Sequence, residues 1–187
     1  MTSGKWHYYD EKERRTFQDP EGILNKIGLN EDHTLIDIGC GQGFFTLPAA
    51  RIVGPRGKNF AIDSNPEAVL LLKKKATEAG LNNIFLAVQE AEAGPVCDRC
   101  ADFVFLGIVL HDFRDPLKVL QNAVKMLKPG GKLINLDWKK ETMDKGPPVE
   151  KRFDEMKAVT LMLKAGLNIQ KMENCGQYTY LITAELV

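Results

Sequence analysis

The stretch LIDIGCGQGFFTL, residues 35–47, places three glycines within five residues between two apolar segments. We expect a buried strand over 34–38 before the glycines and a helix over 44–54 after them. Glycine is needed where the chain turns tightly or where backbone comes close to another group. The glycines therefore predict a turn whose backbone N–H groups contact a ligand at the start of a helix.

Short apolar runs alternate with longer amphipathic segments along the rest of the chain, which is typical of a parallel sheet with helical crossovers. Further strands are expected over 58–63, 83–88, 102–109 and 132–138, and helices over 65–80, from 116 to a stop at Pro129, and over 149–166. Residues 167–187 are interpreted as two strands joined around Cys175. The predicted fold class is α/β, with a Rossmann-like, doubly wound, seven-stranded sheet that is mostly parallel and has an antiparallel C-terminal strand.

The length, charge and hydropathy of the sequence limit the classes of protein to which the chain can belong. The 187 residues, 44% of them hydrophobic, predict a single domain, with residues 1–32 as an N-terminal cap segment and 33–187 as the Rossmann-like core. Twenty-five basic residues balance 25 acidic ones, so nucleic acid is an unlikely partner. No apolar run approaches the roughly 20 residues of a membrane span, and we expect no membrane contact and a cytoplasmic protein.

Four cysteines are few for a chain of this length. Cys97 and Cys100 have the spacing of a metal or redox motif, but a zinc site needs four ligands and no second such pair is present. We therefore expect reduced thiols and no metal.

The second strand ends in Asp63, and an ionised carboxylate there can accept hydrogen bonds from both hydroxyls of a ribose. The glycines follow the order G-C-G-Q-G, and Phe44 stands where a dinucleotide-binding turn has its third glycine. This spacing favours a nucleotide-like ligand other than a dinucleotide.

At this point the chain resembles the class I S-adenosylmethionine-dependent methyltransferases. DIGCGQG at residues 37–43 is similar to their first motif, Asp63 matches their ribose-binding acid, and residues 88–138 follow their later motifs in order. LHDFRDP and LKPGGKL resemble the small-molecule, quinone-biosynthesis-like branch, methyltransferase types 11 and 25. The resemblance implies a methyltransferase that uses S-adenosyl-L-methionine as cofactor and a small molecule as methyl acceptor.

The resemblance also implies the residues that hold the cofactor. They are Asp37, Gly39, Cys40, Gly41, Gly43, Asp63, Ser64, Glu90, Ala91 and Leu106. Glu90 departs from the family, because many members have an aspartate beside the adenine amino group. A glutamate accepts the same hydrogen bond with one more methylene.

His111 follows the fourth strand directly, at the ligand-bearing edge of the sheet, and its ordinary pKa lies near neutrality. We expect it to act as the catalytic base, oriented by Asp112, although both residues could instead only brace the loop and the cofactor. Candidate substrate contacts are Tyr8 and Tyr9 in the leading segment and Trp138 and Lys139 after the fifth strand, with Arg152 further along. Docking of the aromatic residues and solvation of the lysine are the simpler alternatives.

Several functions stay open on the sequence alone. They are an RNA or protein methyltransferase, an arsenite methyltransferase that uses the cysteines, and a non-catalytic subunit that binds S-adenosylmethionine. Only residues 1–32 and 139–155 are free to form a lid, so a homo-oligomer that completes the pocket is a further alternative.

Overall fold

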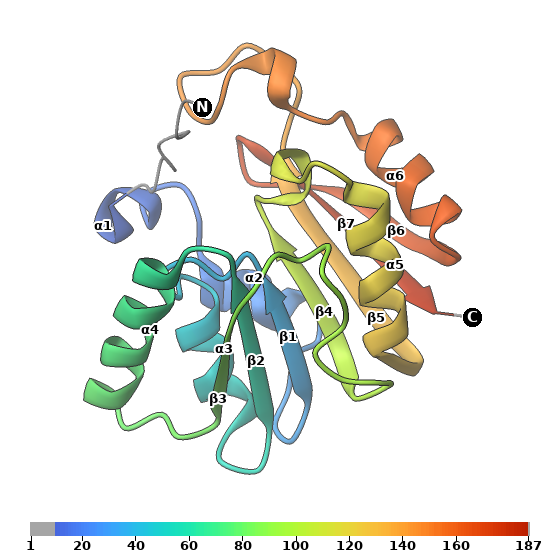
Figure 1. Cartoon of the computed structure of the whole chain (residues 1–187). Helices are drawn as coiled ribbons and strands as arrows, with labels where there is room; N and C mark the ends of the chain where they lie inside the picture. The colour runs from blue at the N-terminus through green and yellow to red at the C-terminus, as the bar shows by residue number, and fades with distance from the viewer. Residues whose placement is uncertain (1–9, 187) are drawn as a thin grey trace.

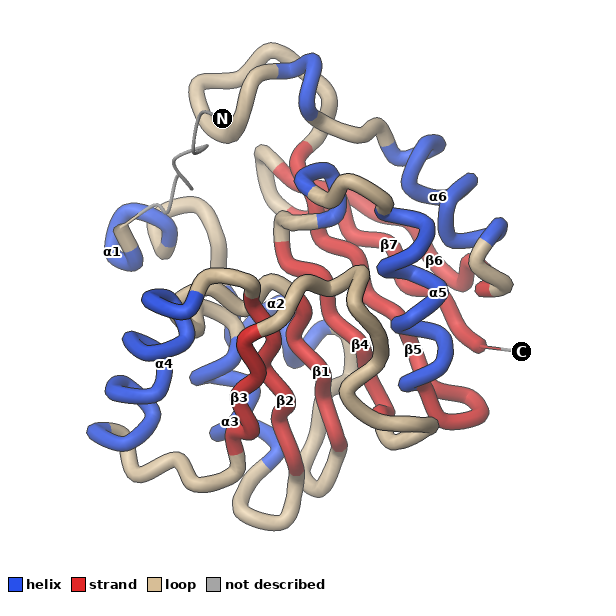
Figure 2. Tube along the Cα trace, viewed as in Figure 1, coloured by secondary structure: helices blue, strands red, loops and turns tan. Residues whose placement is uncertain are grey.

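The computed structural model describes residues 10–186 of the chain as one sheet with helices on both faces (Figure 1). The sheet has seven strands in the order β3-β2-β1-β4-β5-β7-β6. Their bounds are β1 Thr34–Ile38, β2 Lys58–Asp63, β3 Ile84–Val88, β4 Ala101–Gly107, β5 Leu127–Trp138, β6 Leu167–Cys175 and β7 Thr179–Leu186. Figure 2 shows the strands as one continuous twisted layer.

The strand directions confirm the predicted fold class. β1 runs parallel to β2 on one side and to β4 on the other, so the chain order reverses between β1 and β4. β7 is antiparallel to both β5 and β6. A parallel sheet of this kind binds ligands at the carboxyl ends of the strands beside the reversal.

The helices begin where the sequence provides caps. Asn65, Asp115 and Asp154 accept hydrogen bonds from backbone N–H groups in the first turns of α4, α5 and α6, and a proline follows each of the first two. The helices are α1 Glu11–Arg14, α2 Pro20–Lys26, α3 Thr46–Val53, α4 Pro66–Glu78, α5 Pro116–Met126 and α6 Glu155–Lys164, with short 3₁₀ turns η1 Leu110–Asp112 and η2 Val149–Lys151.

The helices cover the two faces of the sheet in separate groups. α2 and α3 pack on one face around Phe105 and Leu136, and α4 extends this layer over β2. α5 and α6 pack on the other face around Val104 and Leu133. Burial of these aliphatic and aromatic side chains is the main stabilising contribution to such a domain.

Two helices differ from their predicted bounds. The helix expected over 149–166 begins only at Glu155, because Arg152 and Phe153 are buried in extended backbone and Asp154 provides the cap. The helix from Pro116 ends at Met126, because Leu127 already pairs with Ala101 across a register shift between β4 and β5. Tertiary contacts set both limits.

The crossover from β3 to β4 is a loop. Residues 89–100, all of them described, form no helix, so the end of the sheet is only partly covered there and Phe85 is 46% exposed beside Phe60. Cys97 and Cys100 lie in this loop and form a disulfide, so the expectation of reduced thiols at these positions was wrong. The positive φ of Arg99, 42°, reverses the chain between them and brings their Cα atoms to 6.1 Å. Cys40 and Cys175 are free.

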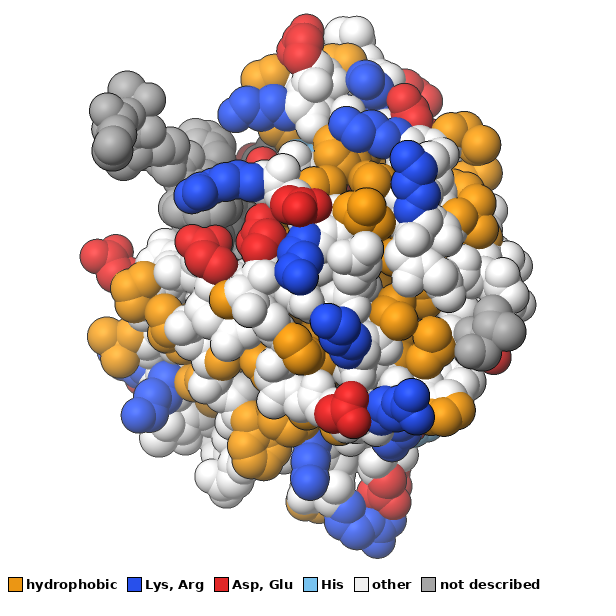
Figure 3. All heavy atoms as spheres, turned by 45° about the vertical axis from the view of Figure 1, so that its right-hand side comes forward, with side chains coloured by type: hydrophobic (Ala, Val, Ile, Leu, Met, Phe, Trp, Pro, Cys, Tyr) orange, Lys and Arg blue, Asp and Glu red, His pale blue; other side chains and the backbone are white. Residues whose placement is uncertain are grey.

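The surface carries charges of both signs. Figure 3 shows acidic and basic side chains interspersed with hydrophobic ones over one face of the molecule. Among residues 10–186, no helix is both long enough and apolar enough to cross a membrane.

The disulfide is open to a direct test. We expect alkylation of the unfolded, unreduced protein to modify two thiols, Cys40 and Cys175, because the other two sulfurs are bonded to each other. Intact mass spectrometry counts the modified thiols, and prior reduction should raise the count to all four. Cys97→Ser serves as the control, since it frees Cys100 for labelling. Modification of four thiols without reductant would contradict the bond.

Candidate functional site

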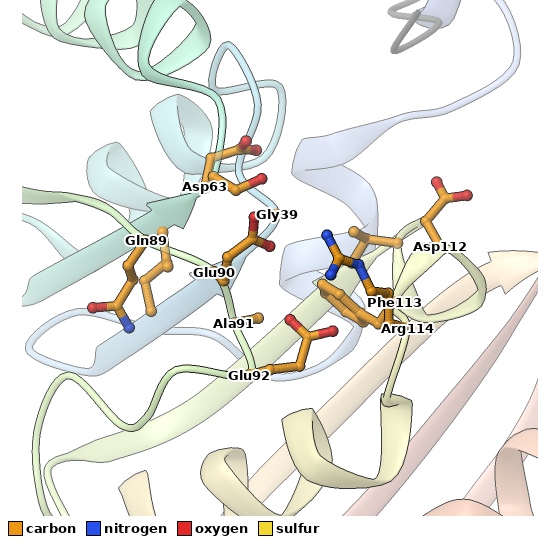
Figure 4. Close-up of a pocket in the computed structure, with 12 residues that line it drawn as sticks. Gly39, Asp63, Gln89, Glu90, Ala91, Glu92, Asp112, Phe113 and Arg114 are labelled. Atoms are coloured by element: carbon orange, nitrogen blue, oxygen red, sulfur yellow. The ribbon is translucent and has the colours of Figure 1, made fainter. Parts of the chain in front are cut away.

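A pocket of about 290 Å³ lies at the carboxyl edge of the sheet, where the chain order reverses. Figure 4 shows Asp63 at the end of β2, Glu90, Ala91 and Glu92 on the loop after β3, and Asp112, Phe113 and Arg114 on the opposite wall. The full lining is Gly39, Ile62, Asp63, Ser64, Gln89, Glu90, Ala91, Glu92, Val109, Asp112, Phe113 and Arg114. The pocket therefore joins four segments that are far apart in sequence, those that follow β1, β2, β3 and β4.

The glycine turn closes onto the neighbouring strand. The N–H groups of Gly39 and Cys40 donate to the carbonyl of Ile62 in β2, at 2.8 and 3.0 Å. Gly39 has a φ of +74°, and a Cβ atom there would lie 2.6 Å from the side chain of Val109, which follows the neighbouring strand β4. Both the backbone angle and this close approach require glycine.

Asp63 connects the glycine turn to the start of α4. Its Oδ2 accepts the N–H of Gly41 at 2.7 Å and its Oδ1 accepts the N–H of Asn65 at 2.9 Å. Each carboxylate oxygen has a second lone pair. The side chain thus holds two turns in place and keeps acceptor capacity on the pocket wall.

The loop after β3 is held in place by hydrogen bonds from α5. Asn122 of α5, itself buried, donates to the carbonyls of Ala91 and Glu92 at 3.0 and 3.2 Å. Gln89 donates to the carbonyl of Gly94 at 3.1 Å, while Figure 4 shows Glu92 extending toward Phe113 and Arg114. These contacts give Glu90 and Ala91 a defined backbone on the pocket wall.

Five of the predicted cofactor residues lie outside the pocket lining, namely Asp37, Cys40, Gly41, Gly43 and Leu106, and the two glycines belong to the buried glycine turn. Asp37 is 2% exposed and accepts the hydroxyl hydrogen of Thr46 at 2.6 Å, and its burial raises the pKa of its carboxyl to about 6. Cys40 is buried, and burial raises the pKa of its thiol as well. Leu106 is fully buried in the core under α5 and α6.

His111 lies between two carboxylates. Its Nδ1 is 2.7 Å from Oδ1 of Asp137, and its Nε2 is 3.6 Å from Oδ2 of Asp112. Burial lowers the pKa of His111, but the hydrogen bond and charge of Asp137 and the charge of Asp112 outweigh it, so the pKa is raised above 6.5. Asp112 lines the pocket, whereas the His111 side chain is 2% exposed behind it.

Asp137 was not among the predicted site residues, although it makes the shorter contact with His111. Its position at the end of the fifth strand was a usable signal, because the ends of β4 and β5 meet at one edge of the sheet. Its Oδ1 also accepts the backbone N–H of Trp138 at 2.8 Å. Asp137 is therefore the carboxylate within hydrogen-bond distance of His111, whereas Asp112 lies slightly beyond it.

The predicted substrate residues are placed away from the pocket lining or outside the described chain. Trp138 is 3% exposed and packs beside Phe17, with ring centroids 6.0 Å apart. The ammonium group of Lys139 donates to the carbonyls of Gly176 and Gln177 in the turn between β6 and β7. Tyr8 and Tyr9 lie outside the described residues.

Arg152 shapes the loop that follows β5. Its guanidinium donates to four backbone carbonyls, those of Lys139, Glu141, Lys145 and Pro147, at 2.7 to 3.1 Å. The residue is 3% exposed. Loop 139–148 thus has a defined path although most of it lacks secondary structure, and the guanidinium is engaged with backbone.

The described part of the predicted cap segment spans the same edge of the sheet. Arg14 lies over the ring of Phe44 beside the glycine turn, 4.1 Å from its centroid. Glu13 pairs with Lys145 of loop 139–148 at 2.8 Å, and Glu11 pairs with Lys75 of α4. These contacts connect the two sides of the edge. Within residues 10–186, no three His, Cys, Asp or Glu side chains are grouped to hold a metal ion.

Comparison with known proteins agrees with this geometry. A family profile described as a methyltransferase domain matches residues 29–177. The crystal structure of an S-adenosylmethionine (SAM) dependent methyltransferase from Aquifex aeolicus has a TM-score of 0.87 and 31% identity, over 96% of this chain and 100% of that one.

Two curated relatives are similar in sequence. The ubiquinone/menaquinone biosynthesis C-methyltransferase UbiE of Pasteurella multocida (strain Pm70) is 31% identical over 118 residues, which are 63% of this chain and 44% of the relative. UbiE of Hahella chejuensis (strain KCTC 2396) is 30% identical over 159 residues, 84% and 61% of the two chains. The chain thus spans about half the length of the curated relatives it matches.

Asp37→Asn should stabilise the fold at neutral pH. Burial raises the pKa of Asp37 from 3.8 to about 6, so its ionised form lowers the unfolding free energy above that pH. An asparagine oxygen can still accept from Thr46. We expect a gain on the order of 1–3 kcal/mol above pH 6 that vanishes below 3.8, measured by urea unfolding across pH. Asp98→Asn, at an exposed position, is the control, and a less stable Asp37→Asn protein at neutral pH would contradict this argument.

Arg152→Lys should destabilise loop 139–148. An ammonium group cannot reach four carbonyls in the fixed geometry of a guanidinium, so buried acceptors lose their donors. We expect unfolding free energy to fall by roughly 2–4 kcal/mol and hydrogen exchange over 139–148 to rise. The exposed neighbour Lys151→Ala is the control. Unchanged exchange in the loop would show that Arg152 does not hold it.

Proposed function

Because the chain belongs to the family of S-adenosylmethionine-dependent methyltransferases, we propose that it transfers a methyl group from S-adenosylmethionine to a small-molecule acceptor. The observation that carries the proposal is the pocket itself, in which the glycine turn and Asp63 meet at the reversal of the sheet. Asp112 lines the same pocket, and the buried side chain of His111 lies behind Asp112.

The residues of the pocket suit this cofactor. Four carboxylates, those of Asp63, Glu90, Glu92 and Asp112, surround the cavity with one guanidinium, that of Arg114. The excess of negative charge around the pocket favours a ligand with cationic groups. S-adenosylmethionine carries two such groups, a sulfonium and an ammonium. Burial of the Asp37 carboxyl raises its pKa, so the ionised group lowers the stability of the fold. A destabilising buried charge of this kind is typical of a functional site.

Each predicted cofactor residue has a proposed role that fits its position. Asp63 and Ser64 receive the ribose hydroxyls, and Glu90 and Ala91 border the adenine. Gly39, Gly41 and Gly43 let backbone approach the ligand, while Cys40 and Asp37 support the turn from below. Leu106 backs this wall from the core.

The bound cofactor supplies an electrophilic methyl group next to its sulfonium, so the protein must orient the acceptor and receive its proton. We assign these tasks to Asp112 at the pocket wall and to His111 behind it. The acceptor class that we propose is an electron-rich ring of the quinone-precursor type, because the curated relatives are named as quinone-biosynthesis C-methyltransferases. Trp138, Lys139 and the leading tyrosines Tyr8 and Tyr9 would then shape the acceptor side of the edge.

We propose one domain over residues 1–187, with 1–32 as a cap and 33–187 as the core, a cytoplasmic location and no nucleic-acid partner. Cell fractionation tests the location. A homo-oligomer that completes the acceptor side stays open to measurement by size-exclusion chromatography with light scattering.

Asp63→Ala should weaken cofactor binding. The ribose hydroxyls lose their acceptor and the glycine turn loses its anchor, at a cost of roughly 1–3 kcal/mol. We expect S-adenosylmethionine and S-adenosylhomocysteine to bind the wild-type chain in calorimetry, and their affinity for the variant to fall by about tenfold or more. NAD is the ligand control and Asp98→Ala the protein control. Equal affinity of Asp63→Ala and the wild type would refute the binding mode.

A further inference from the structure

Three side chains form a line from the pocket wall into the core. Asp112 lines the pocket and its side chain is 41% exposed, His111 is 2% exposed and Asp137 is 1% exposed. The contacts are 3.6 Å from Asp112 to Nε2 of His111 and 2.7 Å from Nδ1 of His111 to Asp137. Exposure therefore falls along the line, and only its Asp112 end meets the pocket.

We propose that Asp137 is the positioning residue that fixes His111 as a proton acceptor, and that Asp112 delivers the acceptor's proton to it. This inference rests on the proposed methyl transfer. It goes beyond that function by assigning a direction to the proton and a role to a residue outside the pocket.

The hydrogen bonds of Asp137 determine which nitrogen of His111 carries hydrogen. Its Oδ1 already accepts the backbone N–H of Trp138, a group that can only donate. The same oxygen faces Nδ1 of His111, so Nδ1 must carry a hydrogen to make the contact favourable. Neutral His111 then leaves Nε2 as the basic nitrogen, turned toward Asp112.

The groups around the imidazole come from four elements. Asp137 of β5 and Asp112 of η1 favour the imidazolium, while Arg152, which follows η2, opposes it. Tyr180 of β7 pairs with Asp137 in the sheet and donates its hydroxyl hydrogen to the carbonyl of Phe153 at 3.3 Å. Two carboxylates against one guanidinium leave the site suited to hold an added proton.

The proton balance is simple. A neutral acceptor that gains a methyl group would form a new bond to that carbon and lose one proton, and the electron pair of the broken O–H or C–H bond stays with the acceptor. The electron pair of the broken sulfur–carbon bond would stay on sulfur, and S-adenosylhomocysteine would leave. The proton passes to the carboxylate of Asp112 and then to Nε2 of His111, which becomes an imidazolium. Oδ2 of Asp112 lies 3.6 Å from Nε2 of His111, and a small rotation of Asp112 would bring the two atoms within hydrogen-bond distance. Asp112 then returns the proton to water after the product leaves.

The histidine tautomer can be observed without substrate or cofactor. The chain has three histidines, and His33 is a built-in contrast because its Nδ1 accepts the N–H of Asn30 at 3.0 Å. In two-bond proton–nitrogen correlation spectra of the neutral rings, we expect hydrogen on Nδ1 of His111 and on Nε2 of His33. Variants His7→Gln and His33→Gln assign the signals. Hydrogen on Nε2 of His111 would overturn the proposal.

Two substitutions separate the charge of Asp137 from its acceptor oxygen. Asp137→Asn keeps an oxygen for Trp138 and Nδ1, so the tautomer should persist while the imidazole titrates about one pH unit lower. Asp137→Ala removes the acceptor, and the tautomer preference should disappear. Asp98→Asn should change neither observable. An unshifted His111 titration in Asp137→Asn would contradict the assigned role.

Activity completes the test. The acidic limb of the pH profile of kcat/KM should move in Asp137→Asn in parallel with the titration of His111 seen by NMR. If the titration of His111 moves in Asp137→Asn but the pH profile of kcat/KM does not, His111 and Asp137 have only a structural role and the proposed proton path is rejected. Failure of the proposed function looks different, because S-adenosylmethionine would then not bind the wild-type chain although His111 keeps its tautomer.

Discussion

The carboxylate of Asp63 joins the two turns on which the site is built. One oxygen holds the glycine turn after β1 and the other holds the turn that starts α4. Backbone N–H groups at helix starts have no partners within the helix and need acceptors from elsewhere. A single side chain at the end of β2 thus sets the spacing of both turns. Glu90 and Asp112 line the same pocket as these turns, whose backbone is held within the protein itself.

Buried charge gathers at this edge of the sheet. Asp37, Asp137, His111 and Arg152 are nearly inaccessible to water, whereas the other buried side chains are apolar or uncharged polar ones such as Asn59 and Asn135. The groups are compensated in different ways, Arg152 by four carbonyls and His111 by two carboxylates, while Asp37 has one hydroxyl partner. Burial of ionisable groups costs stability, so their concentration beside a pocket indicates that the edge is built for chemistry.

The sequence was sufficient for the features that depend on neighbouring residues. The positions of the strands, the glycine turn, the position of Asp63 and the cap of α4 all follow from local patterns, and the structure contains them. Contacts between distant segments could not be predicted in this way. Asp137 reaches His111 across 26 residues through the pairing of β4 with β5, and Lys139 turns to the distant turn at Gly176. The disulfide depends on a positive φ at Arg99, which a non-glycine residue rarely adopts.

Arg152 holds loop 139–148 through backbone carbonyls, which every residue type provides. The path of the loop therefore depends little on which side chains it carries, apart from Gly146, where a Cβ atom would lie 2.9 Å from the ring of Trp138. Exposed positions such as Lys140 can change without moving the backbone. A loop of this construction gives the molecule a surface whose side chains can vary while the loop backbone and the neighbouring pocket keep their structure.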